Sequence, residues 1–351
     1  MRKLTFLLFS TTILLTACQG QKQNPYSDLP TFQNEGNPLI RSVYTTHPAT
    51  MVIDDRLYLL AGHDEFYEDK PGYEGKYGYN VTEWMMYSTT DMQTWTDHGV
   101  VLHPTDFSWG VGEAWASQIV RNPLDGKYYF FATLQAGEPF TGKAIGVAVS
   151  DNPTGPFVDA IGHPLVEDKM THNGTRGWWN DSDPTVFFDK DGTPWLCWGN
   201  LNCFMAKLKP SLLELDGGIR ELEFPDYTEG PWIFERYGIY YLVYASRGVD
   251  AERIAYAMSP SIKGPWEPKG DICSYGINSY TIHPAICQFN NKWYFFYHNA
   301  TLDIEGYHGC SGRRCVCVEE LLFNQDGTIQ YIDQTIAGVS TNAKSSTLAF
   351  Q

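Results

Sequence analysis

Positive charge is scarce in this sequence, and its scarcity excludes one broad class of function. The chain of 351 residues has 25 Lys and Arg against 41 Asp and Glu, so its formal net charge at pH 7 is −16. Binding to phosphate backbones, or to anionic lipid through charge alone, requires a surplus of Lys and Arg on the contact face. The sequence therefore predicts no nucleic-acid partner.

Long apolar runs are also nearly absent, and the one that exists lies at the N-terminus. Residues 4–15 are mostly apolar, but about a dozen residues are too few to span a bilayer. The following Leu15-Thr16-Ala17-Cys18 resembles the lipobox of bacterial lipoproteins. We expect a signal peptide over residues 1–17, lipid attachment at Cys18 and a flexible tether over 18–37. The alternative is an ordinary secretory signal with an incidental cysteine.

This N-terminal pattern predicts where the protein resides. A lipid on the first mature residue would make it an exported, membrane-anchored lipoprotein of the periplasm or cell surface. The membrane is then a partner through the anchor only.

Cysteine spacing of the kind that binds zinc is missing from the sequence. Cys197 and Cys203 are six residues apart, and Cys310, Cys315 and Cys317 form a cluster. A structural zinc site requires CxxC-type pairs with further His or Cys ligands. We therefore expect buried cysteines that are occasionally paired in disulfides.

Aromatic residues and turn formers, in contrast, are abundant. Phe, Trp and Tyr make up 15% of the chain, which also has 32 Gly and 20 Pro. Helical periodicity is weak throughout, and aromatic segments separated by Gly, Pro, Asn and Asp are typical of an all-β protein. The 43% of hydrophobic residues suffices for a sizeable core.

One strand pattern recurs along the chain. An apolar strand, often preceded by an acidic residue or His and then Pro, leads through a polar turn into an aromatic strand. The five copies are 47–53 with 57–60, 115–120 with 128–131, 183–188 with 195–198, 229–234 with 240–244, and 283–287 with 293–297. Repeated hairpins predict a five-bladed β-propeller over residues 38–336, followed by a tail over 337–351.

A propeller places the start of each innermost strand around one central funnel. The repeat therefore predicts that five first positions converge there: His47, Trp115, Asp183, Glu229 and His283. Two of the five are carboxylates. Hydrolysis of a glycosidic bond requires a proton donor for the leaving oxygen and a base or nucleophile across the sugar, and a pair of carboxylates fits that requirement.

At this point the chain resembles glycoside hydrolase family 43, whose members cut glycans that carry xylose or arabinose. The resemblance extends from Asn37 to about Ile336. The matching segments are 62–65, 88–92, 95–99, 106–109, 144–150, 183–187, 229–232, 283–284 and 314–320.

The resemblance implies a role for each of several residues. Glu229 is the expected general acid, and Asp183 is expected to raise its pKa and orient it. Arg314 is expected to bind sugar hydroxyls, and Trp115 to form an aromatic wall beside the reacting sugar. No cofactor is implied as a requirement, but His283 is expected to face a central ion, often calcium, or a water.

The sequence departs from the family pattern at the general base. That base is an Asp before the first Pro of the first blade, and this chain has His47 in Thr46-His47-Pro48. Three explanations are open. His47 is itself the base, another carboxylate such as Asp64 or Glu65 replaces it, or hydrolysis has been lost.

The resemblance therefore implies a glycosidase that acts on pentose-containing glycans, as an α-L-arabinofuranosidase or β-xylosidase, by single displacement with inversion. The alternative is a carbohydrate-binding lipoprotein on a degenerate hydrolase fold, which only the substitution at His47 supports.

Overall fold

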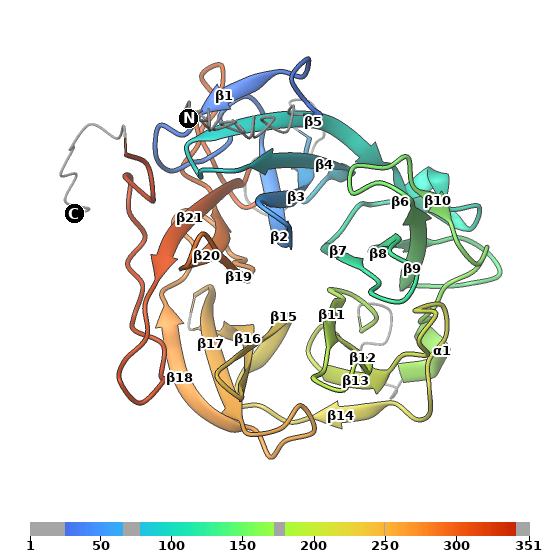
Figure 1. Cartoon of the computed structure of the whole chain (residues 1–351). Helices are drawn as coiled ribbons and strands as arrows, with labels where there is room; N and C mark the ends of the chain where they lie inside the picture. The colour runs from blue at the N-terminus through green and yellow to red at the C-terminus, as the bar shows by residue number, and fades with distance from the viewer. Residues whose placement is uncertain (1–24, 66–77, 172–179, 249, 342–351) are drawn as a thin grey trace, which may run out of the picture.

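A computed structural model describes residues 25–65, 78–171, 180–248 and 250–341. Its strands form five antiparallel sheets arranged in a ring around a central axis, so the predicted five-bladed β-propeller is confirmed (Figure 1). Cys18 and the expected signal segment 1–17 lie outside the described residues. No helix in the described ranges is long and apolar enough to cross a bilayer.

The first two sheets each contain five strands. The strands of the first blade are β1 (Thr31–Gln33), β2 (Thr45–Ile53), β3 (Arg56–Asp64), β4 (Val81–Thr89) and β5 (Thr94–Leu102). Those of the second blade are β6 (Gly110–Gly112), β7 (Ser117–Arg121), β8 (Tyr128–Ala136), β9 (Lys143–Ser150) and β10 (Val158–Asp159).

The remaining sheets have four, four and three strands. The third blade contains β11 (Thr185–Phe188), β12 (Pro194–Trp198), β13 (Cys203–Lys207) and β14 (Arg220–Leu222). The fourth contains β15 (Tyr227–Arg236), β16 (Ile239–Arg247), β17 (Glu252–Ser259) and β18 (Glu267–Cys273). The fifth contains β19 (Ala285–Phe289), β20 (Lys292–Asn299) and β21 (Cys315–Leu321). Within the described ranges the helical elements are η1 (Pro104–Asp106) and α1 (Asp168–Thr171).

Each predicted repeat hairpin forms the inner pair of strands of one blade, and in two of the five the turn has the backbone that the tightest hairpins require. Asn290 and Asn291, between β19 and β20, both have positive φ, 48° and 62°. Tyr237 and Gly238, between β15 and β16, also have positive φ, 50° and 89°. Two positive φ values match the twist of the flanking strands.

The propeller begins earlier than the sequence indicated. Residues 31–33 were expected in the flexible tether, but they form β1, the outermost strand of the first blade, with Phe32 opposite Trp95. Pairing with the free edge of β5 satisfies backbone groups that an edge strand would otherwise expose. The tether prediction is therefore wrong for this segment.

The ring is closed by the segment that precedes β2. The Leu39 N–H donates to the Val316 carbonyl oxygen at 2.9 Å, and the Thr45 N–H donates to that of Arg314, also at 2.9 Å. The first blade is thereby joined to the fifth.

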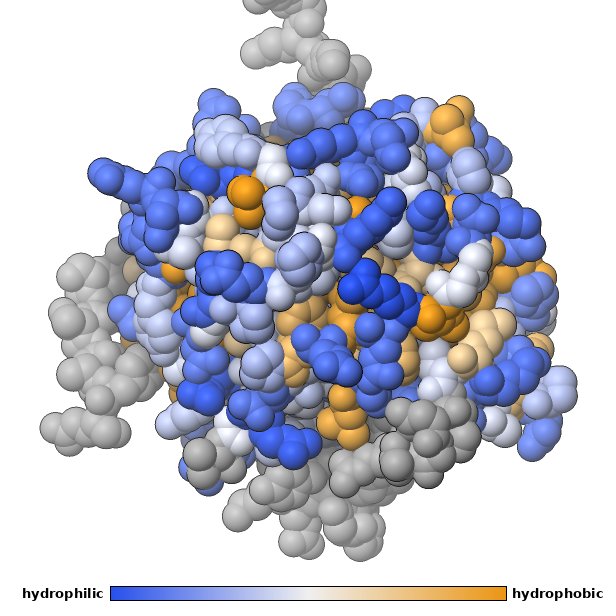
Figure 2. Space-filling view, turned by 90° about the horizontal axis from the view of Figure 1, so that it is seen from below, coloured by the Kyte–Doolittle hydropathy of each residue, from blue (hydrophilic) through white to orange (hydrophobic). Residues whose placement is uncertain are grey.

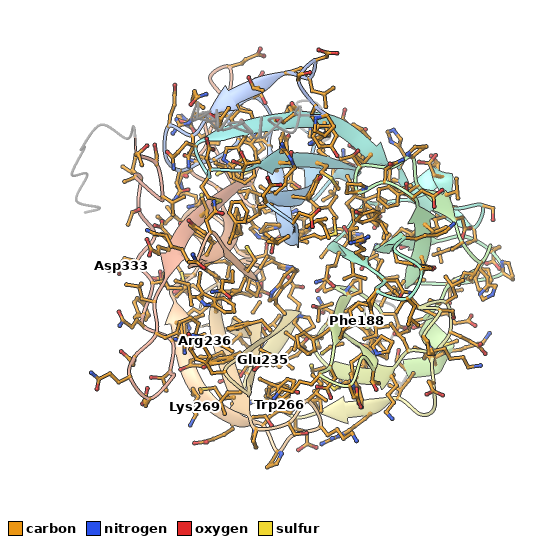
Figure 3. The ribbon with its side chains drawn as sticks, viewed as in Figure 1. Phe188, Glu235, Arg236, Trp266, Lys269 and Asp333 are labelled. Atoms are coloured by element: carbon orange, nitrogen blue, oxygen red, sulfur yellow. The ribbon has the colours of Figure 1, made fainter. Side chains whose placement is uncertain are left out.

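Side chains fill the space between the blades (Figure 3). The largest fully buried ones include Trp84, Trp95 and Trp198, so aromatic residues supply much of the core. The charged Lys269 and Asp333 lie at the outer rim of the ring. The face of the molecule in Figure 2 is largely hydrophilic, with apolar residues visible between the hydrophilic ones in its middle and toward its right side.

Candidate active site

A cavity of about 400 Å³ opens at one end of the propeller axis. Its lining contains all five first positions of the repeat: His47, Trp115, Asp183, Glu229 and His283. The predicted convergence is therefore confirmed.

The two carboxylates are placed by unusual backbone at the start of their strands. Asp183 precedes β11 with φ of 60°, and its N–H donates to the Thr133 hydroxyl at 2.9 Å. Glu229 lies at an irregularity in the pairing of β15 and β16, next to Gly230 with φ of 60°. The Gly230 N–H donates to Asp183 Oδ2 at 3.1 Å, which joins the two positions. A Cβ on Gly230 would lie 3.0 Å from the Nδ1 atom of His283, so a larger residue would crowd the site.

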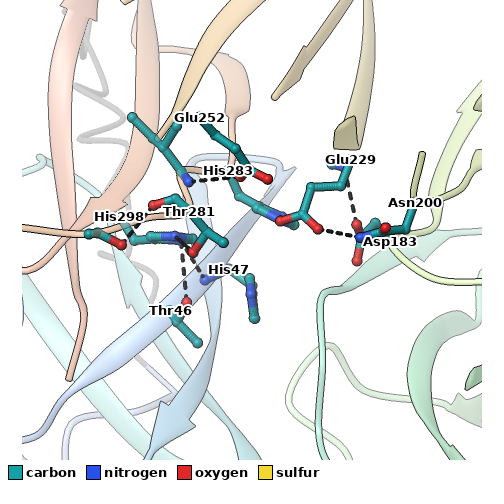
Figure 4. A network of polar contacts seen from close by, with 12 residues as sticks. Thr46, His47, Asp183, Asn200, Glu229, Glu252, Thr281, His283 and His298 are labelled. Atoms are coloured by element: carbon teal, nitrogen blue, oxygen red, sulfur yellow. Dashed lines mark hydrogen bonds and ion pairs between the residues drawn. The ribbon is translucent and has the colours of Figure 1, made fainter. Parts of the chain in front are cut away.

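The Glu229 carboxylate is held at both oxygens (Figure 4). His283 Nε2 lies 2.7 Å from Oε1, and the Asn200 side-chain amide donates to Oε2. One oxygen of Asp183, one of Glu229 and a ring nitrogen of His283 all lie within 4.8 Å of one another. The site is thus a compact cluster of two acids and one imidazole.

The directions of the pKa shifts in this cluster differ from those that the sequence predicted. Burial raises the pKa of Asp183 to about 7. Burial also favours protonation of Glu229, but His283 and Arg314 outweigh it and hold the pKa of Glu229 below its ordinary value. The expected rise in the pKa of Glu229 is therefore contradicted. The physical reason is the direct contact with His283, whose own pKa is raised above its ordinary value because Glu229 and Asp183 outweigh burial.

Arg314 lies immediately before β21 and is fixed by Asp64 at the end of β3. Its Nε and Nη2 atoms donate to Asp64 Oδ2 and Oδ1, each at 2.8 Å, and its backbone N–H donates to Oδ2 at 3.0 Å. The two side chains are only 1% and 0% exposed. Such a bidentate ion pair holds the guanidinium in one orientation.

His47 lies against this arginine. Arg314 Nη1 donates to His47 Nε2 at 3.2 Å, so the ring proton is on Nδ1. Nδ1 is buried without a hydrogen-bond partner among the residues that the structure describes. Burial, followed by the charge of Arg314, holds the pKa of His47 well below its usual range. The imidazole is therefore neutral, and its lone pair faces Arg314.

The two other carboxylates considered as bases are poorly placed for that role. Both oxygens of Asp64 are bound to Arg314, and Asp64 does not line the cavity. Glu65 is exposed and likewise lies outside the cavity lining. The geometry therefore favours neither.

Trp115 forms part of the cavity wall as a partly exposed ring. Its Nε1 donates to Glu113 Oε2 at 2.9 Å, and the Lys143 ammonium lies 5.0 Å from the ring centroid. An aromatic face held in this way offers a surface on which a sugar ring packs.

Several residues of the site were missed by sequence reasoning, because they lie outside the first position of the repeat. Asn200 is in the turn between β12 and β13, and Glu252 begins β17. Glu252 lines the cavity at 3% exposure, and burial followed by the charge of Glu229 raises its pKa well above its ordinary value. Thr281 Oγ1 accepts a hydrogen bond from Arg314 Nη1 at 3.2 Å. The Tyr79 ring packs against the guanidinium, with 4.7 Å between the ring centroid and Arg314 Cζ.

The Asp183, Glu229 and His283 cluster is also the group of side chains whose geometry comes nearest to a metal site among the described residues. Calcium prefers about 6–8 oxygen ligands. The cluster supplies two carboxylates and one imidazole, and that imidazole already contacts Glu229. This donor set does not fit calcium, so the reaction proposed below contains no metal-dependent step.

Paired carboxylates, a fixed arginine and an aromatic wall around one cavity define a glycosidase-type site on a propeller. The family model described as glycosyl hydrolases family 43 matches residues 35–329. The chain therefore belongs to glycosyl hydrolase family 43, and it is a glycosidase.

Individual relatives agree with this assignment. The chain is 26% identical over 378 residues to an arabinoxylan arabinofuranohydrolase of Bacillus subtilis, covering 97% of this chain and 72% of that protein. It is 27% identical over 344 residues to a xylosidase/arabinosidase of Bacteroides ovatus, covering 86% and 98%. Among solved structures, one similar protein is a β-xylosidase/α-arabinofuranosidase from a compost microbial metagenome, in a calcium-free complex with xylotriose. Its TM-score is 0.73 and its sequence identity 27%, and the match covers 88% of this chain and 100% of that one.

Proposed function

We propose that the protein hydrolyses pentose-containing glycans as an α-L-arabinofuranosidase or β-xylosidase, with inversion at the anomeric carbon. The observation that carries this proposal is the pair of buried Asp183 and partly buried Glu229, joined through the Gly230 N–H at the cavity. The activities of the relatives, an arabinofuranohydrolase and a xylosidase/arabinosidase, support the sugar class. An uncharged sugar also suits a protein whose net charge is −16.

In the proposed reaction, Asp183 and Glu229 together hold one proton near neutral pH. The raised pKa of Asp183 and the lowered pKa of Glu229 place that proton mainly on Asp183 in the free protein. Because the two carboxylates are coupled, the proton belongs to the pair. Glu229 delivers it to the leaving oxygen, and the two carboxylates then stabilise the oxocarbenium-like transition state.

Water activation is assigned to His47 in this proposal. A base needs a free lone pair, and in the structure the lone pair on Nε2 faces Arg314. We infer that a sugar hydroxyl competes for Arg314 Nη1 when substrate binds, which frees Nε2 to accept a proton from water. The ion pair with Asp64 keeps the arginine in reach of both partners.

We further propose that the protein is exported and anchored to a membrane through a lipid on Cys18. The support is the sequence pattern Leu15-Thr16-Ala17-Cys18 after a short apolar run. This proposal concerns where the enzyme meets its glycan and is independent of the reaction.

The test of the reaction is Glu229→Gln. A Gln has no acidic proton for the leaving oxygen, so turnover of arabinoxylan oligosaccharides should fall by about 100-fold or more, within the range of general acid catalysis. Nitrophenyl pentosides, whose leaving group hardly needs protonation, should lose much less. The matched control is Glu235→Gln, in the same strand but outside the cavity lining, which should leave both rates unchanged (Figure 3). Equal oligosaccharide turnover by Glu229→Gln and the parent would remove Glu229 from the role.

A further inference from the structure

Two cysteines of the third blade lie side by side in the reduced form. Cys197 in β12 and Cys203 at the start of β13 have their sulfur atoms 3.6 Å apart. The side chains are buried, and Cys197 lies opposite Met205, two residues from Cys203, so both thiols are on the same face of the sheet. A disulfide requires the sulfurs to approach to about 2.05 Å, a movement of roughly 1.5 Å between two side chains that already face each other.

The turn between these cysteines holds the backbone of both catalytic carboxylates. The Gly199 N–H donates to the Ser182 carbonyl oxygen at 2.8 Å, and the Leu201 N–H donates to that of Thr228 at 2.6 Å. Ser182 and Thr228 immediately precede Asp183 and Glu229 in the chain. The turn therefore connects the start of β11 with the start of β15.

The same turn carries a direct partner of the proposed acid. Asn200 donates its side-chain amide to Glu229 Oε2. Gly199 has φ of 131°, and a Cβ there would lie 1.9 Å from the Asn202 carbonyl oxygen, so the turn is tightly folded. A covalent bond between the two ends of this turn would therefore limit the movement of Asn200.

We propose that Cys197 and Cys203 are a modification site, a dithiol that becomes a disulfide in an oxidising compartment and thereby fixes turn 199–202 against the Asp183 and Glu229 pair. Activity is then redox-dependent. The inference about activity rests on the proposed glycosidase reaction; formation of the bond does not.

The chemistry is thiol–disulfide exchange with a disulfide oxidant. One thiol loses its proton and attacks the oxidant, releasing one reduced thiol. The second cysteine thiol then attacks the mixed disulfide and releases the other, so two electrons pass from the protein to the oxidant. Cys203 is only 1% exposed, but it lines a cavity of about 300 Å³ together with Asn202 and Arg247, and we expect the oxidant to approach through that cavity. Burial raises the pKa of the Cys197 thiol well above its usual range, which keeps this thiol protonated in the reduced form.

The first experiment reads the bond without using activity. The full-length protein, in its exported form, is incubated with oxidised glutathione or with dithiothreitol, alkylated, and digested after Lys and Arg. One peptide, residues 191–207, contains Cys197 and Cys203 and no other cysteine. We expect it to lack both alkyl groups and to be lighter by two hydrogens in the oxidised sample. If both cysteines of this peptide were fully alkylated after treatment with oxidised glutathione, and also after refolding in its presence, the proposal would be overturned.

The second experiment asks whether the bond acts on the site. Oxidation should raise the midpoint of thermal unfolding by on the order of 5 °C, and reduction should lower kcat on oligosaccharides several-fold with little change in KM. The double variant Cys197→Ser with Cys203→Ser should lose both responses, whereas Cys287→Ser, a cysteine in another blade, should keep them.

The outcomes separate this proposal from the proposed function. If the parent has no turnover in either redox state but forms the bond and gains stability, the glycosidase reaction fails and the disulfide site stands. If the bond forms and kcat is the same in both states, the link from the turn to Glu229 is refuted.

Discussion

The buried contact between Arg314 and Asp64 should be one of the most expensive in the molecule to break. Replacing Asp64 by Asn keeps the shape of the side chain but removes its charge. Arg314 is 1% exposed and donates three hydrogen bonds to this carboxylate, counting its backbone N–H. A buried guanidinium left without its counter-charge costs about 3–5 kcal/mol. For a domain of this size that corresponds to a fall of roughly 5–8 °C in the unfolding midpoint.

The assay is thermal unfolding followed by circular dichroism, with urea unfolding as a second measure of free energy. The matched control is Asp151→Asn, which breaks the pair with Lys127 at 3.2 Å on the surface, where the side chains are 79% and 47% exposed. Exposed pairs contribute below about 1 kcal/mol, so Asp151→Asn should be close to the parent. If Asp64→Asn were no more destabilised than this control, the reasoning that Arg314 depends on Asp64 would be refuted.

Three further predictions concern the reaction and the anchor. His47→Ala should lose rate on oligosaccharides and nitrophenyl pentosides alike, because water must be activated whatever the leaving group, and His47→Asp should retain more; an unaffected His47→Ala would disprove the histidine base. The kcat/KM of the parent should fall as pH rises through about 7, because Asp183, with a pKa of about 7, then loses the proton that it shares with Glu229. If kcat/KM of Asp183→Asn fell over the same pH range, this explanation would be contradicted. Cys18→Ser should move the exported protein from the membrane pellet to the soluble fraction in ultracentrifugation, and a variant that stays in the pellet would contradict the lipid anchor.

The propeller could be predicted because its unit is local. A hairpin places residues that are close in the sequence opposite each other, so the apolar strand, polar turn and aromatic strand of each copy are visible in one short window. Five copies then imply a ring, and the ring implies that His47, Asp183 and Glu229 meet. The error at the N-terminus has a matching cause. Residues 31–33 pair with β5 about sixty positions later, and nothing local in three polar and aromatic residues indicates that partner.

The protonation of the site was misjudged for the same reason. The sequence placed Asp183 and Glu229 together but did not reveal that His283 Nε2 approaches Glu229 to 2.7 Å. A neighbouring carboxylate alone would raise the pKa of Glu229, whereas a direct contact with a raised-pKa imidazole lowers it. The outcome depends on distances of a few ångströms, which a list of residues does not contain.

The class of fold, the family resemblance and the side chains at the mouth of the propeller could all be predicted from the sequence, because repetition and short motifs are properties of neighbouring residues. The interactions between those side chains depend on how the folded chain brings distant residues together. Arg314 meets Asp64 across 250 residues, and Asn200 meets Glu229 from another blade. Such contacts form when the ring closes, and the energy of a charge depends on which partners and how much water the closed ring leaves beside it.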